Sequence, residues 1–180
     1  MTPASIQFLD ETIVDAVGSI FGLAGEAVTV PIRGVLVSAS EGSIAATVGF
    51  TSAEVRGAVV TMTSAKLIAA AWPRELRSSA PGERDISDWA GELTNQLVGR
   101  LKNRLAASGL VLVQSTPTVI VGRHLDKAAA TGTLARRYVF QGAEGVLVVC
   151  LDIVTDGHFD LHLARQGGSL SAPEGHLELF

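Results

Sequence analysis

The stretch GELTNQLVGRLKNRL (residues 91–105) carries a carboxylate and a carboxamide three positions apart, Glu92 and Asn95. In a helix, two residues at this spacing lie about one turn apart on the same face, so both side chains can enter one shallow site on a partner. The amide can donate and accept hydrogen bonds, whereas the carboxylate can pair with a cation. At about 100° per residue, these and three further residues fall within about 80° of one another. This set, here called the polar stripe, comprises Asp88, Glu92, Asn95, Gly99 and Lys102.

The polar stripe has two interpretations. On an arbitrary helix, such a stripe is usually the solvated side. Gly91 and Gly99 argue against that interpretation, because glycine inside a helix costs about 1 kcal/mol relative to alanine and a solvated face gains nothing in return. The loss of two side chains beside Glu92 and Asn95 is explained if another backbone approaches closely there. This favours a partner.

The helix that carries the polar stripe is predicted from about Ile86 to Ala107, ending before Ser108-Gly109. Its other side is apolar and should face the core. The apolar residues recur at helical spacing and are Trp89, Leu93, Leu97, Leu101 and Leu105.

The remaining elements predict an α+β fold with a mainly antiparallel sheet and long helices packed on it. Thr2-Pro3 starts a first amphipathic helix that ends at the glycines from Gly22 onward. A short second helix is predicted at 63–73, followed by a charged connection at 74–85. Strands are predicted at 27–37, 44–50, 55–62, 110–114, 117–122, 134–141 and 145–154. We expect one domain over residues 1–154, with residues 155–180 as an extension of that domain or a flexible end.

Two halves of this plan look alike, each a helix followed by three strands. The clearest echo is FTSAEVRGAVVTM (50–62) against FQGAEGVLVVCL (140–151), and each half has a proline in its first strand, Pro31 and Pro117. The sheet is therefore predicted to consist of two pseudo-repeated halves.

Composition narrows the classes of partner and compartment. The 180-residue chain has a formal charge of −4 and a pI near 5.5, which argues against nucleic acid or an anionic membrane as partner. Apolar runs such as Val146–Leu151 are far shorter than the roughly 20 residues that span a bilayer. The N-terminus has no signal-peptide pattern, and the single cysteine, Cys150, cannot form an internal disulfide. We expect a cytoplasmic protein.

Asp88, Glu92 and Asn95, followed by Pro117, resemble the signature of the CheC/CheX/FliY chemotaxis phosphatases. The surrounding segments GELTNQLVGRLK, STPTVIVG and VGFTSAEVRGAVVTMTSAKLIAA are also similar to those of the family, and the resemblance covers roughly residues 5–154. The same interval counted back from Pro31 reaches Ile6 and Leu9 instead of Glu and Asn. One motif per chain resembles CheX more closely than CheC.

The resemblance implies hydrolysis of the aspartyl phosphate of a CheY-like receiver domain. Asn95 would orient the attacking water, and Glu92 would pair with the receiver's active-site lysine. Asp88, Gly99 and Lys102 would contact the receiver, although Asp88 could instead favour the first helical turn. The resemblance further implies a homodimer and no cofactor of the chain's own, because the receiver supplies Mg²⁺. The alternative is a non-catalytic adaptor of the same fold that binds a receiver or another signalling partner.

Other patterns carry less weight. His158, Asp160 and His162 alternate along a possible strand, but this is more often a polar strand face than a metal site, and we expect no metal site. Arg136 and Arg137 should lie on opposite faces of their strand. Cys150 is expected to be a small buried residue, not a nucleophile. Neither a serine triad nor a glycine-rich phosphate loop is indicated.

Overall fold

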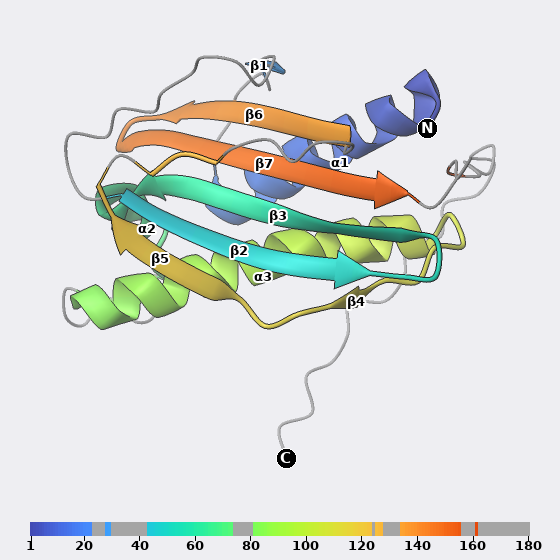
Figure 1. Cartoon of the computed structure of the whole chain (residues 1–180). Helices are drawn as coiled ribbons and strands as arrows, with labels where there is room; N and C mark the ends of the chain where they lie inside the picture. Colours follow the sequence, from blue (N-terminus) through green and yellow to red (C-terminus); the bar gives the residue numbers. More distant parts are fainter. Residues whose placement is uncertain are drawn as a thin grey trace.

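The protein is described from a computed structural model that covers residues 1–22, 28–29, 43–73, 81–123, 125–127, 134–155 and 161. Over these residues, one antiparallel sheet carries the two long helices on one of its faces (Figure 1). The predicted α+β class with a mainly antiparallel sheet is therefore confirmed. None of the helices in this part of the chain is long and apolar enough to cross a membrane.

The first helix, α1, spans Pro3–Phe21, as predicted from its cap residues. The Thr2 hydroxyl accepts a hydrogen bond from the Ser5 backbone N–H at 3.3 Å, which satisfies one of the donors left open at a helix start. Gly22 ends the helix with a left-handed φ of 64°, a conformation that costs glycine little. Leu9 is buried and Ile6 is half-buried, so the two positions where a first motif would stand pack toward the protein.

Over the described residues, the sheet contains seven strands in the order β1-β6-β7-β3-β2-β4, with β5 also paired to β2, and all pairs are antiparallel. The strands are β1 (Val28–Thr29), β2 (Ser43–Thr51), β3 (Val55–Ser64), β4 (Val113–Gln114), β5 (Thr118–Gly122), β6 (Leu134–Gly142) and β7 (Gly145–Thr155). Each predicted strand is present, although only Val28–Thr29 of the first one is described and the strand predicted at 110–114 is reduced to two residues.

The sheet order is compatible with two pseudo-repeated halves. Exchanging β1 with β5, β2 with β6 and β3 with β7 maps the order of the strands onto itself in reverse. Pro31, one of the two prolines in the proposed repeat, lies outside the described residues. The repeat itself remains a prediction, as does the boundary at residue 154.

The second and third helices are α2 (Ala65–Ala70) and α3 (Glu83–Ala106). The predicted start of α3 at Ile86 was wrong by one turn. The Asp85 carboxylate accepts a hydrogen bond from the Gly82 backbone N–H at 2.9 Å and so caps the helix before the apolar pattern begins. Asp88 consequently lies in the second turn, and its suggested role in the first turn was also wrong.

The main core lies between the sheet and the helices α1 and α3. Its buried residues include Leu9, Ile13 and Val17 of α1, Leu97 and Leu101 of α3, and Phe140, Leu147 and Leu151 of the sheet. Within this contact, the buried Thr61 hydroxyl of β3 lies 2.6 Å from the Thr94 hydroxyl, which donates to the Ala90 carbonyl at 2.9 Å. The hydrogen bond between Thr61 and Thr94 is buried and joins α3 to the sheet. It therefore fixes the rotation of α3 about its axis and the direction in which the polar stripe faces.

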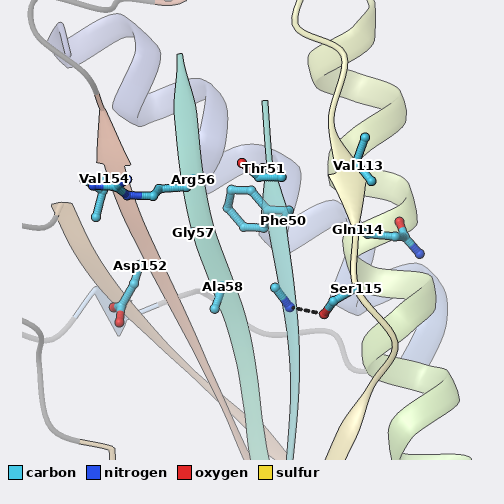
Figure 2. Close-up of a pocket in the computed structure, with 11 residues that line it drawn as sticks. Phe50, Thr51, Arg56, Gly57, Ala58, Val113, Gln114, Ser115, Asp152 and Val154 are labelled. Carbon is cyan, nitrogen blue, oxygen red and sulfur yellow. Dashed lines mark hydrogen bonds between the residues drawn. The ribbon is translucent and has the colours of Figure 1, made fainter. Parts of the chain in front are cut away.

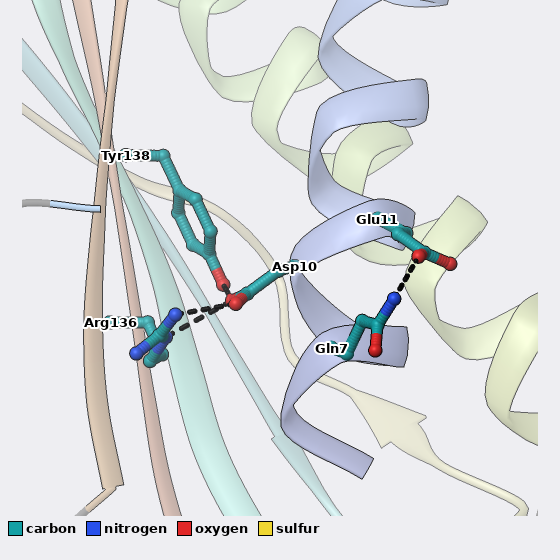
Figure 3. Close-up of polar contacts among 5 residues, drawn as sticks. All are labelled: Gln7, Asp10, Glu11, Arg136 and Tyr138. Carbon is teal, nitrogen blue, oxygen red and sulfur yellow. Dashed lines mark hydrogen bonds and ion pairs between the residues drawn. The ribbon is translucent and has the colours of Figure 1, made fainter. Parts of the chain in front are cut away.

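A cluster of polar side chains attaches α1 to β6 (Figure 3). The Asp10 carboxylate accepts hydrogen bonds from Arg136 Nε at 3.0 Å and from the Tyr138 hydroxyl at 2.7 Å. Tyr138 is 0% exposed, and its burial, followed by the bond to Asp10, raises the pKa of its hydroxyl well above 10.0. The native state therefore holds this proton more tightly than the unfolded chain.

We expect this tyrosine to stay protonated until the protein unfolds in alkali. Since the folded pKa is raised, its contribution to the unfolding free energy is complete below pH 10 and is lost as the pH rises above that value. Tyr138 is the only tyrosine, so tyrosinate absorbance follows it directly. The unfolding free energy of wild type should fall more steeply above about pH 10 than that of Tyr138→Phe. Reversible ionisation near pH 10 in the folded protein would contradict this expectation.

Candidate functional site

The polar stripe lies along the flank of α3 that borders β4 and β5. Asp88 is exposed, whereas Glu92, Asn95, Gly99 and Lys102 are half-buried. The stripe was predicted to lie opposite the apolar face, and this was only partly right because the buried arc of α3 is wider than predicted. Besides Leu93, Leu97, Leu101 and Leu105, it includes Ala90, Gly91, Thr94 and Val98. The exposed residues Gln96, Arg100 and Asn103 lie beyond the stripe.

Asn95 makes a hydrogen bond with the sheet. The Gln114 side-chain Nε2 donates to Asn95 Oδ1 at 2.8 Å, in a partly buried contact. Gln114 belongs to β4, where it pairs with Phe50 of β2. Over the described residues, the Asn95 amide nitrogen makes no hydrogen bond within the chain, and it is therefore available to a bound molecule.

Glu92 and Asp88 have partners along α3 and none elsewhere in the described residues. Glu92 Oε1 accepts a hydrogen bond from Gln96 Nε2 at 2.9 Å, and Asp88 lies 3.9 Å from Arg84 Nε. Both members of the second pair are exposed, so this ion pair contributes little to stability. In the part of the chain that is described, neither carboxylate is tied to the sheet, and both can accept a partner's cation.

Gly91 and Gly99, the two glycines near Glu92 and Asn95, have different surroundings. A side chain at Gly91 would place its Cβ 3.2 Å from Val119 and 3.4 Å from Pro117, so this glycine permits close contact between α3 and the β5 edge. The idea that Gly91 makes room for a partner was therefore wrong. A Cβ at Gly99 would meet nothing within 4 Å. Only Gly99 remains as an open position in the stripe.

A shallow pocket lies beside β4, on the sheet face opposite the helices (Figure 2). Arg56, Ala58 and Asp152 contribute to it from strand positions that alternate with the buried ones. Ser115 on its rim accepts a hydrogen bond from the Gly49 N–H at 2.9 Å and donates to the Thr116 carbonyl at 3.1 Å. Asp152 is paired with Lys127. These groups are engaged in the fold, and no nucleophile with a base is formed among them.

The structure describes two of the other sequence patterns, the arginine pair and the single cysteine. Arg136 contacts Asp10 of α1, whereas Arg137 contacts Asp126 from the other face, so the two arginines are separated as predicted. Cys150 is buried, which raises the pKa of its thiol and makes it a poor nucleophile, as expected. The residues His158, Asp160 and His162 lie outside the described part of the chain, within which no group of three or more His, Cys, Asp or Glu side chains could hold a metal ion.

Gln114 is the residue of this site that sequence reasoning missed. A strand was predicted at 110–114, but its register against β2 could not be known from the sequence. That register decides that the side chain of Gln114 points to Asn95 and that of Val113 to the other face.

The chain is similar to known proteins in both sequence and fold. The family model described as chemotaxis phosphatase CheX matches residues 44–140. A chemotactic CheC-like protein from Shewanella oneidensis has a TM-score of 0.67 and 17% identity, with 85% of this chain and 99% of that chain covered. The CheX–CheY–BeF3–Mg²⁺ complex from Borrelia burgdorferi has a TM-score of 0.58 and 15% identity, with 83% and 97% covered. No curated protein sequence matches. At these identities, the structural matches show a shared fold.

Proposed function

The chain belongs to the CheX family of chemotaxis phosphatases, and from this premise we propose that it hydrolyses the aspartyl phosphate of a CheY-like receiver domain. The observation that carries the proposal is Asn95, half-buried on the polar stripe with its amide nitrogen available to a bound molecule. Glu92 lies one helical turn away on the same stripe. The match to the family model includes all of α3 and the strands beside it.

The proposed reaction requires little covalent chemistry from this chain. A water oxygen attacks phosphorus in line, the bond between phosphorus and the aspartate oxygen breaks, and the receiver recovers its carboxylate while inorganic phosphate leaves with the water's protons. An acyl phosphate already has a good leaving group, so positioning of the water accounts for most of the acceleration. Mg²⁺ comes with the receiver and neutralises charge on the phosphoryl oxygens. Asn95 holds the water by donating to it and accepting from it.

Glu92 is proposed to anchor α3 on the receiver by pairing with its active-site lysine. Its second carboxylate oxygen makes no hydrogen bond within the described residues, so it can accept one from an ammonium group. Asp88 and Lys102 would contact the receiver on either side of this pair, and Gly99 would let the receiver backbone approach α3. These roles need a receiver domain, and the proposal includes a cytoplasmic location for the activity.

We also propose that the chain forms a homodimer through the β4–β5 edge of the sheet. Four large apolar side chains are exposed in this region: Val111 (70%), Val113 (66%), Ile120 (53%) and Val121 (64%). Such exposure at a sheet edge is typical of an association surface. Ile120→Lys should shift the protein toward monomer in sedimentation velocity. Ala106→Lys, at an exposed position at the end of α3, should not. A monomeric wild type would contradict the proposal.

The test of the proposed function is the decay of phosphate from a panel of Mg²⁺-bound phosphorylated receivers, with and without this protein. At least one receiver should lose its phosphate faster in its presence. Receivers that bind without faster decay would instead support the adaptor.

A further inference from the structure

Gln114 is held in place independently of its side chain. Its backbone lies between two attachments to β2, namely the pairing of Val113 with Thr51 and the hydrogen bond from the Ser115 N–H to the Gly49 carbonyl at 2.9 Å. The Gly49 N–H in turn donates to the Ser115 hydroxyl at 2.9 Å. Figure 2 shows the side chain projecting from β4 away from β2, and its amide nitrogen donates to Asn95 of α3.

The contact between Gln114 and Asn95 fixes a torsion that is otherwise soft. The terminal torsion of an asparagine is broad, so the two ends of its amide can exchange places at small cost. Gln114 Nε2 donates to Asn95 Oδ1 at 2.8 Å, which selects the orientation in which the Asn95 amide nitrogen points away from β4. A carbonyl oxygen has two lone pairs, so Oδ1 can still accept a second bond.

We propose that Gln114 is a positioning residue for the phosphatase reaction, holding the Asn95 amide so that its nitrogen faces the attacking water. The inference rests on the proposed function, because it needs a reaction in which the Asn95 amide orients water. With the amide held in this way, Nδ2 donates to the water while the free lone pair of Oδ1 accepts from it. Gln114 itself touches neither water nor phosphate.

Two charged substitutions of similar length separate this role from a structural one. A lysine in Gln114→Lys can only donate, so it preserves the direction of the bond to Asn95 Oδ1. A glutamate in Gln114→Glu can only accept at neutral pH, so the Asn95 amide must turn its nitrogen toward β4 and its oxygen toward the water. If Gln114 merely packs, the two variants should have similar activities.

The experiment measures kcat and KM for the phosphorylated receiver, with thermal unfolding of each variant as a check on folding. Gln114→Glu should lower kcat at saturating receiver by about tenfold or more, because a donor to the reacting water is lost. Gln114→Lys should retain kcat within about threefold of wild type, because the bond keeps its direction. Thr116→Glu on the exposed neighbouring loop controls for the added negative charge, and it should leave kcat unchanged.

Failure of the positioning role of Gln114 and failure of the phosphatase function give different results. If wild type does not accelerate decay, the proposed function fails. If wild type is active but Gln114→Glu retains full kcat, or if both variants lose kcat equally, Gln114 is not a positioning residue. If Gln114→Glu does not fold, Gln114→Met decides: removal of the donor should still lower kcat with KM little changed, and an unchanged kcat would overturn the inference.

Discussion

Asn95→Ala should lower the rate of receiver dephosphorylation at saturating receiver by about 100-fold or more, which is the cost of losing precise placement of a reacting group. Alanine can neither donate to the water nor accept from it, while the receiver, its Mg²⁺ and its leaving group are unchanged. Affinity for the receiver should fall little, because the anchoring role is assigned to Glu92. Both quantities come from decay rates measured over a range of receiver concentrations.

Asn103→Ala is the matched control for this substitution. Asn103 lies on the same helix and is exposed, more than two helical turns from Asn95. The same change of side chain there should leave the rate unaltered. A similar loss in the two variants would point to damage to α3 and not to a role for Asn95.

Glu92→Gln is expected to have the second largest effect, on affinity. Truncating or neutralising one member of a desolvated ion pair across an interface costs roughly 2–5 kcal/mol, so the Kd for the receiver should rise by about 30-fold or more. Glutamine has the same shape, so it should keep the local contact with Gln96 without the charge that attracts the receiver's lysine. The decay rate at saturating receiver should fall less than with Asn95→Ala.

Glu83→Gln controls for the change in net charge, since Glu83 is exposed in the first turn of the same helix. A double-mutant cycle with the receiver's active-site lysine then tests the pairing itself. If Glu92 pairs with this lysine, Glu92→Gln should cost little further affinity once the lysine is removed. Additive losses would contradict the assignment.

Local signals in the sequence predicted the helices well. Thr2-Pro3 and Gly22 defined α1 because capping depends on residues adjacent in the chain. The apolar repeat of α3 identified Leu93, Leu97, Leu101 and Leu105 as buried. The start of α3 was missed because residues 83–85 follow a charged, proline-containing segment and carry no apolar repeat, whereas the cap is a contact between Gly82 and Asp85.

Features set by contacts between distant segments could not be predicted. Gly91 was interpreted as room for a partner, because the sequence does not reveal that β5 packs against it. The bond between Asn95 and Gln114 depends on the register between β4 and β2. These segments are more than 60 residues apart in the sequence, as are Gly49 and Ser115, whose hydrogen bond also links them. The polar stripe itself was predictable because helical periodicity alone places its residues on one face.

The most direct test of the account uses a receiver that binds this protein, phosphorylated with Mg²⁺ and mixed with about one tenth as much protein, so that acceleration requires turnover. We predict that the receiver releases inorganic phosphate much faster with wild type or Asn103→Ala than it does alone. With Asn95→Ala, the rate should stay close to that of the receiver alone. Equal decay with wild type and Asn95→Ala, or binding of the receiver with no acceleration by wild type, would contradict the phosphatase mechanism.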